Sequence, residues 1–125
     1  MRNTKTILVV DDEVHIRRAI ELKLQTAGYQ VITARNGQEG LASILEHQPD
    51  AVITDITMPY MDGKELCQKS NPLKAERPFL TVIVTARIEP NEREWIQAMH
   101  DSVFMEKPFS PTRLLEVVDR YLGTA

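Results

Sequence analysis

Three aspartates are the residues of this chain whose types and spacing could support chemistry. Asp11 and Asp12 directly follow the apolar run Ile7–Val10, and Asp55 directly follows another run, Ala51–Thr54. Two carboxylates about 4 Å apart repel by ~1 kcal/mol in water and by ~4 kcal/mol at an effective dielectric constant of 20. A cluster of this kind either has raised pKa values or binds a cation, and oxygen ligands without histidine or cysteine favour Mg²⁺.

The adjacent pair also has a simpler interpretation. Asp11 and Asp12 precede a helical pattern, and acidic side chains are favoured there because they accept hydrogen bonds from the first N–H groups of a helix. Capping does not explain Asp55, so this alternative stays open for the first two aspartates alone.

Two more polar residues follow strand-like runs. Thr85 ends a fourth run and Lys107 follows a fifth. Taken singly, the threonine is an ordinary strand terminus and the lysine is a solvated loop residue. Beside a carboxylate–metal site they supply a hydroxyl donor and a cation, which are the groups needed to bind a phosphoryl group and to neutralise its transition-state charge.

Strands and helices must alternate to place these residues. Apolar, β-branched runs predict strands at Thr6–Val10, Gln30–Thr33, Ala51–Thr54, Leu80–Val84 and Val103–Met105. Helical spacing and stop signals predict helices at Ile16–Ala27, Gln38–His47, Gly63–Ser70, Asn91–Met99 and Pro111–Leu122.

This order predicts an α/β fold, a flavodoxin-like doubly wound (βα)5 domain over residues 1–125 with a five-stranded parallel sheet in the order 2-1-3-4-5. Strands 1 and 3 are neighbours at the topological switch point, where such folds place their sites. Asp11, Asp12 and Asp55 should therefore meet in one crevice at the carboxyl edge of the sheet.

Several residues carry more local expectations. Asn71-Pro72 should keep the third helix short and the loop after it long. Trp95 should pack at the core or its rim, and His100 should be an exposed loop residue. The last helix should bury Leu114, Leu115, Val118, Tyr121 and Leu122.

Composition excludes several classes of protein. The 125 residues, 42% hydrophobic and 26% charged, are typical of a soluble globular domain. A net charge of −3 without a basic cluster argues against direct nucleic-acid binding. Cys67, the single cysteine, should be buried and cannot form an internal disulfide, which fits a reducing compartment. The first apolar run is too short for a signal peptide or a membrane span, so we expect a cytoplasmic protein without membrane contact.

Four motifs resemble, in order and over essentially the whole chain, the receiver domain of two-component response regulators. They are Ile7-Leu8-Val9-Val10-Asp11-Asp12, Asp55-Ile56-Thr57-Met58-Pro59-Tyr60-Met61-Asp62-Gly63, Val84-Thr85-Ala86 and Lys107-Pro108-Phe109. Each motif is weak alone, but the four at these spacings are highly specific.

The resemblance implies that Asp55 accepts a phosphoryl group from a sensor histidine kinase or a histidine phosphotransfer protein. Asp12, Asp55 and the backbone carbonyl of Thr57 would hold Mg²⁺, for which Mn²⁺ could substitute, and Asp11 would act largely through water. Thr85 and Lys107 would bind the phosphoryl group, with Lys107-Pro108 in the cis form. The chain would be a signalling domain, not an enzyme, that assists only its own phosphorylation and dephosphorylation.

The resemblance also implies a switch. Thr85 would move toward the phosphoryl group, and Phe104, where many family members have tyrosine, would fill the space it leaves. The surface of the fourth helix, fifth strand and fifth helix would change, and a homodimer through that surface is left open. Thr57 and Arg87 would tune the lifetime of the phosphoryl group.

Two other classes fit parts of the pattern. A flavodoxin-like cofactor protein shares the fold, but Asp11-Asp12 would repel the phosphate of a flavin. A phosphatase of the haloacid dehalogenase type also uses an aspartate with Mg²⁺. Its motif separates the two acids by one residue, whereas here they are adjacent, and it normally has a cap insertion for which this length leaves little room.

Overall fold

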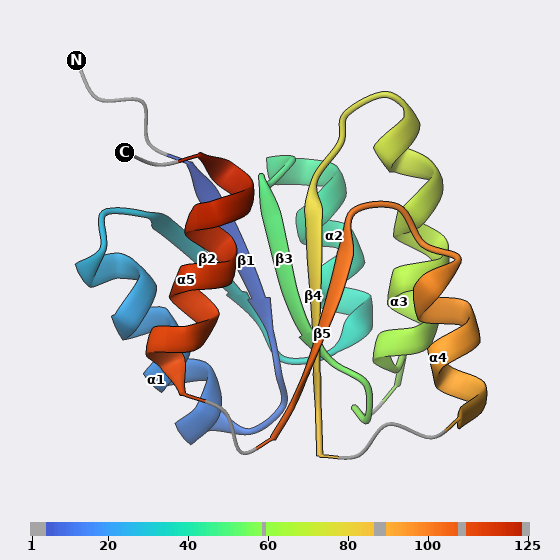
Figure 1. The fold of residues 1–125 in the computed structure, drawn as a ribbon, viewed down its shortest axis with the longest axis horizontal. Coiled ribbons are helices and arrows are strands. Elements are labelled where there is room, and N and C mark those ends of the chain that lie inside the picture. Colours follow the sequence, from blue (N-terminus) through green and yellow to red (C-terminus); the bar gives the residue numbers. More distant parts are fainter. Residues whose placement is uncertain (1–4, 59, 87–89, 108–109, 124–125) are drawn as a thin grey trace.

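Five parallel strands form one sheet in the order β2-β1-β3-β4-β5 (Figure 1). The structure is a computed structural model and describes residues 5–58, 60–86, 90–107 and 110–123. The strands are β1 (Thr6–Val10), β2 (Gln30–Ala34), β3 (Ala51–Asp55), β4 (Leu80–Thr85) and β5 (Ser102–Glu106). The predicted strand order is confirmed, and each predicted strand lies within one residue of an observed one.

Helices follow the strands in turn. They are α1 (Val14–Thr26), α2 (Gly37–His47), α3 (Gly63–Ser70), α4 (Pro90–Gln97) and α5 (Pro111–Leu122). A polar side chain caps the amino end of three of these helices. Asn36 accepts the Glu39 N–H at the start of α2, Asp62 accepts the Glu65 N–H at the start of α3, and Ser110 caps α5. These caps place each helix directly after a loop at the carboxyl edge of the sheet.

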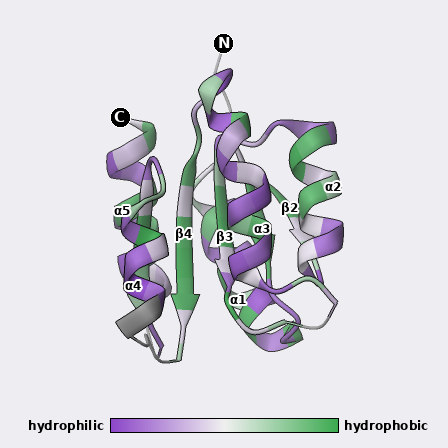
Figure 2. Ribbon diagram, turned by 90° about the vertical axis from the view of Figure 1, so that its right-hand side faces the viewer, coloured by the Kyte–Doolittle hydropathy of each residue, from purple (hydrophilic) through white to green (hydrophobic). Residues whose placement is uncertain are grey.

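Apolar residues cover both faces of the sheet. In β1, Ile7 and Val9 pack toward α1 and α5, whereas Leu8 and Val10 pack toward α2 and α3. Successive side chains of a strand point to opposite faces, so a strand covered on both sides is apolar throughout. Figure 2 shows the hydrophobic strands β3 and β4 and the mixed character of the helices around them. A third cluster joins α4 to the sheet through Ile83 and Ile96.

The segment after α3 differs from the prediction. The α-helix ends at Ser70 as expected, but the chain continues as a 3-10 helix, Asn71–Ala75, in place of a long loop. Proline is tolerated in a first turn, where its missing N–H would have no partner, and Pro72 takes that position here. Lys74 from this turn is buried, and its ammonium donates to the backbone carbonyls of His100 and Asp101.

The local expectations are mostly confirmed. Cys67 is buried, and burial raises the pKa of its thiol to about 12. Trp95 packs at the rim of the α4 cluster, and His100 is exposed. Tyr121 is a correction: it is 39% exposed, because α5 turns Leu114 and Val118 to the sheet and leaves Tyr121 at the edge of that stripe.

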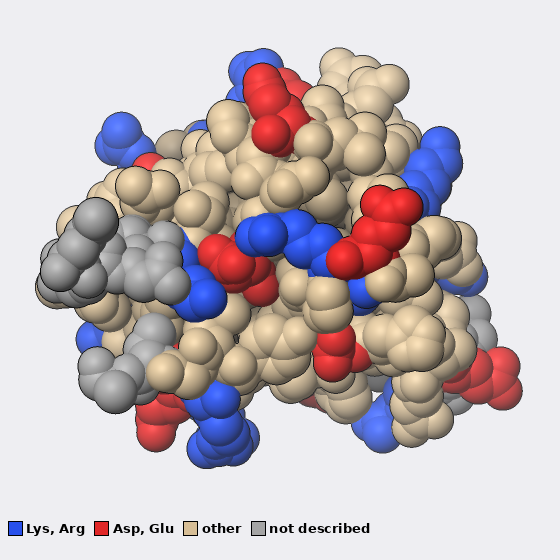
Figure 3. Space-filling view, turned by 90° about the horizontal axis from the view of Figure 1, so that it is seen from above, with Lys and Arg blue, Asp and Glu red and all other residues tan. Residues whose placement is uncertain are grey.

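The amino ends of the strands form a face of mixed charge. Figure 3 views the molecule from above, onto these ends, where acidic and basic side chains lie next to one another. Arg77, just before β4, pairs with Asp50, just before β3, at 3.2 Å. The part of the chain that the structure describes contains no helix long and apolar enough to cross a membrane.

Candidate functional site

The carboxyl edge of the sheet brings the three aspartates together. Asp11 follows β1, Asp55 ends β3, and these strands are hydrogen-bonded neighbours. Asp11 and Asp55 are buried, whereas Asp12 is exposed. Within the described residues, each of the three offers a carboxylate oxygen, and these oxygens lie within 4.8 Å of one another. The predicted convergence at the switch point is confirmed.

The loop after β3 is held against the strand end by hydrogen bonds and a close approach. The Ile56 N–H donates to Asp55 Oδ1 at 2.7 Å, and the Gly63 N–H donates to the Ile56 carbonyl at 2.7 Å. A Cβ atom on Gly63 would lie 1.9 Å from the Asp55 carbonyl oxygen, so only glycine fits at the start of α3. This contact fixes the backbone from which the Asp55 side chain projects.

Asp11 is oriented by the turn into α1. Its Oδ1 accepts the Glu13 N–H at 2.8 Å, and its carbonyl accepts from the guanidinium of Arg17 at 2.8 Å. Burial raises the pKa of Asp11 against the hydrogen bond from Glu13 and the charge of Lys107, which lower it. The helix itself begins at Val14 with Glu13 as N-cap and no side-chain cap bond, so Asp11 and Asp12 are not its capping residues.

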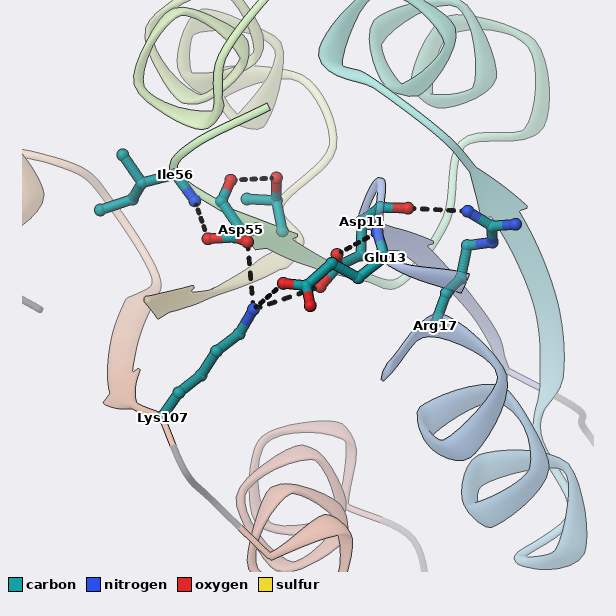
Figure 4. Close-up of polar contacts among 7 residues, drawn as sticks. Asp11, Glu13, Arg17, Asp55, Ile56 and Lys107 are labelled. Atoms are coloured by element: carbon teal, nitrogen blue, oxygen red, sulfur yellow. Dashed lines mark hydrogen bonds and ion pairs between the residues drawn. The ribbon is translucent and has the colours of Figure 1, made fainter. Parts of the chain in front are cut away.

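Lys107 is the cation of the site. Its ammonium nitrogen lies 3.1 Å from Asp55 Oδ2, 3.4 Å from Glu13 Oε1 and 3.7 Å from Asp11 Oδ2 (Figure 4). Partial burial disfavours the charged form, but the hydrogen bond to Asp55 and the surrounding carboxylates outweigh it, so the pKa of Lys107 is raised. Lys107 therefore stays protonated at neutral pH and directs its charge into the acidic cluster.

Thr85 and Phe104 lie on neighbouring strands. Thr85 is buried at the end of β4, and its carbonyl accepts the Lys107 N–H at 2.7 Å, which ties the lysine backbone to the strand end. Phe104 is in β5 opposite Ile83 and is 37% exposed, and the Arg93 guanidinium carbon lies 5.6 Å from the centre of its ring.

The structure gives less detail on the other predicted site residues. Thr57 is exposed in the loop directly after β3. Arg87 and Pro108 lie outside the described residues, and the cis form of Lys107-Pro108 therefore stays a prediction. Glu13 was missed as a site residue, although its position directly after Asp11-Asp12 was a signal that it would lie at the same edge.

The donor set suits a hard divalent cation. Three carboxylates from two strand ends offer oxygen ligands, and none of the groups in this cluster is a histidine or cysteine. Mg²⁺ is bound by one or two carboxylates with several waters, so a cluster with one exposed member, Asp12, fits it. The same edge also presents a lysine and a threonine, the combination that binds a phosphoryl group.

The chain is similar in sequence to known proteins. The family described as the response regulator receiver domain matches residues 7–119. The chain is 40% identical over 115 residues to a probable transcriptional regulator, ycf27, of Porphyra purpurea, covering 91% of this chain and 46% of that protein. It is 36% identical over 107 residues to the alkaline phosphatase synthesis transcriptional regulatory protein PhoP of Bacillus subtilis, covering 86% and 44%.

Solved structures of known proteins share this fold. A CheY-like response regulator receiver domain protein from Methanospirillum hungatei superposes with a TM-score of 0.88 at 32% identity, covering 97% of this chain and 95% of that one. The chain spans about half the length of the curated relatives it matches, 46% and 44% for the two above.

Proposed function

The chain belongs to the response regulator receiver domain family of two-component systems, and from that premise we propose that Asp55 accepts a phosphoryl group. The observation that carries the proposal is the position of Asp55 at the end of β3, beside two further aspartates and 3.1 Å from the Lys107 ammonium. A nucleophilic carboxylate with a cation at this distance can attack phosphorus while the added negative charge is neutralised.

Asp11, Asp12 and Asp55 would hold Mg²⁺ together with the backbone carbonyl of Thr57. When bound, Mg²⁺ neutralises charge on the phosphoryl oxygens. The raised pKa of buried Asp11 and the proximity of the three carboxylates support this assignment, because a poorly solvated carboxylate close to others is stabilised by a bound cation.

Lys107 and Thr85 would bind the phosphoryl group from the side of β4 and β5. Lys107 remains protonated and pairs with a phosphoryl oxygen, and the Thr85 hydroxyl donates to another. Movement of Thr85 would let Phe104 turn inward and alter the surface formed by α4, β5 and α5, a local charge change that biases two conformations. We propose that the altered surface passes the signal on by forming a homodimer.

The donor would be a phosphohistidine of a sensor histidine kinase or a histidine phosphotransfer protein. A receiver domain spanning residues 1–125 needs no cap insertion and no flavin, and the family match favours it over the phosphatase and flavodoxin alternatives.

The test is phosphorylation of the whole chain with acetyl phosphate and Mg²⁺. We expect one acid-stable, base-labile phosphoryl group per chain, detected by intact mass, and none in Asp55→Asn. Asp62→Asn, which removes an acid from the same loop but outside the three-aspartate cluster, is the matched control and should still be labelled. Full labelling of Asp55→Asn at an unchanged rate would refute the assignment.

A further inference from the structure

Glu13 is the one carboxylate that contacts Lys107 without belonging to the three-aspartate cluster, within the part of the chain that the structure describes. Its backbone is fixed, because the Glu13 N–H donates to Asp11 Oδ1 at 2.8 Å. Its side chain is 60% exposed, so it lies on the solvent-facing side of the site, which we call its mouth. Figure 4 shows Glu13 beside Lys107, with Oε1 3.4 Å from the ammonium.

Both oxygens of Asp55 have a hydrogen-bond partner in this structure. The Ile56 N–H occupies Oδ1 at 2.7 Å, and Lys107 occupies Oδ2 at 3.1 Å. The Ile56 N–H is part of the loop that Gly63 holds against β3, so it cannot withdraw without moving that loop. The ammonium of Lys107 is carried by a long, flexible side chain, so Lys107 is the partner that can leave Asp55.

Phosphorylation requires such a change of partner. An Asp55 oxygen donates an electron pair to phosphorus, the P–N bond of a phosphohistidine or the P–O bond of acetyl phosphate breaks, and the leaving imidazole or acetate keeps the bonding pair. Lys107 keeps its proton and moves from the Asp55 oxygen to a phosphoryl oxygen. During this exchange a second acceptor can hold the ammonium near the site.

We propose that Glu13 is a positioning residue whose carboxylate holds the Lys107 ammonium at the mouth of the site while Lys107 exchanges Asp55 for the phosphoryl group. Asp11 is the other nearby acceptor at 3.7 Å, but a cation bound by the aspartates would neutralise it. Glu13 stands outside the cluster and would not be bound to that cation, so its carboxylate could still accept from Lys107. This inference rests on the proposed function of Asp55.

The first test compares initial rates of labelling by saturating acetyl phosphate with Mg²⁺. Exposed ion pairs contribute ~0.2–1 kcal/mol, so Glu13→Gln should be slower by a factor of about 1.4 to 5. Glu46→Gln, which removes an exposed carboxylate on α2, is the matched control and should label at the wild-type rate. In a Lys107→Met background, Glu13→Gln should cause no further loss, because the partner it acts through is gone.

The second test adds a measurement that does not depend on phosphorylation, namely the mobility of the Lys107 side chain. In the Mg²⁺-loaded protein, NMR order parameters of the Lys107 Cε group should fall in Glu13→Gln and stay unchanged in Glu46→Gln. Mg²⁺ affinity of Glu13→Gln, measured by calorimetry, should fall by less than the labelling rate does. A larger fall would make Glu13 a metal ligand and overturn the inference.

Two further results would also overturn it: an unchanged Lys107 order parameter in Glu13→Gln, or the same loss of rate with and without Lys107. Failure of the proposed function looks different, because the wild-type chain would then take no label at all. In that case the order parameters still decide whether Glu13 holds Lys107.

Discussion

Gly63 and Asp55 are in direct backbone contact: a Cβ atom on Gly63 would lie 1.9 Å from the Asp55 carbonyl oxygen and 2.8 Å from its carbonyl carbon. The contact joins the first residue of α3 to the last residue of β3, so the loop between them closes tightly at the site. The glycine is required here by lack of space and not by an unusual backbone angle, since the residues with positive φ include Gly28 and Gly123 but not Gly63.

Gly63→Ala should therefore destabilise the protein by about 3 kcal/mol, the upper part of the range for overpacking, because backbone atoms must move to relieve the clash. Urea unfolding measures the change. Gly123→Ala is the control: nothing lies within 4 Å of its Cβ, so only the positive φ is disfavoured, at a cost of ~1 kcal/mol. Equal losses in the two variants would contradict the steric explanation.

Asp11→Asn should stabilise the metal-free protein. Burial raises the pKa of Asp11, so the native state holds the proton of this carboxyl more tightly than the unfolded state. The contribution of Asp11 to stability is thus greatest below its unfolded pKa and falls as the pH rises through the native value. At pH 7 the charged carboxylate destabilises the native state, and we expect Asn at this position to raise the free energy of unfolding by about 1 kcal/mol.

The same variant should respond less to Mg²⁺. A ligand at ten times its dissociation constant stabilises the native state by about 1.4 kcal/mol, and loss of a carboxylate from the cluster should remove most of that gain. Thermal unfolding with EDTA and with Mg²⁺ measures both effects, and Glu46→Gln should show neither. An Asp11→Asn protein that is less stable in EDTA than the wild type would show that its hydrogen bonds outweigh its charge.

The burial of Lys74 predicts a second pH dependence of stability, at a position far from the aspartates. Its ammonium lies under the α4–β5 turn, donates to the carbonyls of His100 and Asp101, and stands 4.9 Å from the centre of the Phe79 ring. Burial lowers the pKa of Lys74 to about 8. Between that value and its unfolded pKa near 10.4 the unfolded state binds more protons, so stability from this group rises with pH across this window.

Lys74→Met should remove that rise, which we expect to be about 1–3 kcal/mol between pH 8 and pH 10.5. The measurement is the difference in unfolding free energy between variant and wild type as a function of pH, which cancels the other titrating groups. Lys69→Met, at a half-exposed position on α3, should leave the wild-type slope unchanged. A Lys74→Met protein with the wild-type slope would mean that Lys74 titrates as an exposed lysine does.

Local patterns in the sequence predict the elements and the meeting of the aspartates. Strands such as Thr6–Val10 are recognisable because a parallel strand buried on both faces must be apolar throughout. Asp11 and Asp55 directly follow or end two such strands. Because neighbouring parallel strands end at the same edge, their sequence positions alone place these carboxylates together. Thr85 and Lys107 follow from the same rule.

Side-chain partners depended on the tertiary structure. Glu13 contacts Lys107 across the sheet edge, and Lys74 reaches the turn before β5; no periodicity predicts either contact, because each depends on how long side chains pack between elements distant in sequence. Tyr121 was expected inside from its spacing, but the rotation of α5 on the sheet leaves it outside.

The chain by itself thus determined which residues stand at the reactive edge, since strand period and strand order are local and topological properties. Only the packed structure decided which carboxylates share Lys107 and which lysine is buried, because burial and charge pairing are set by contacts between elements and not by any one of them.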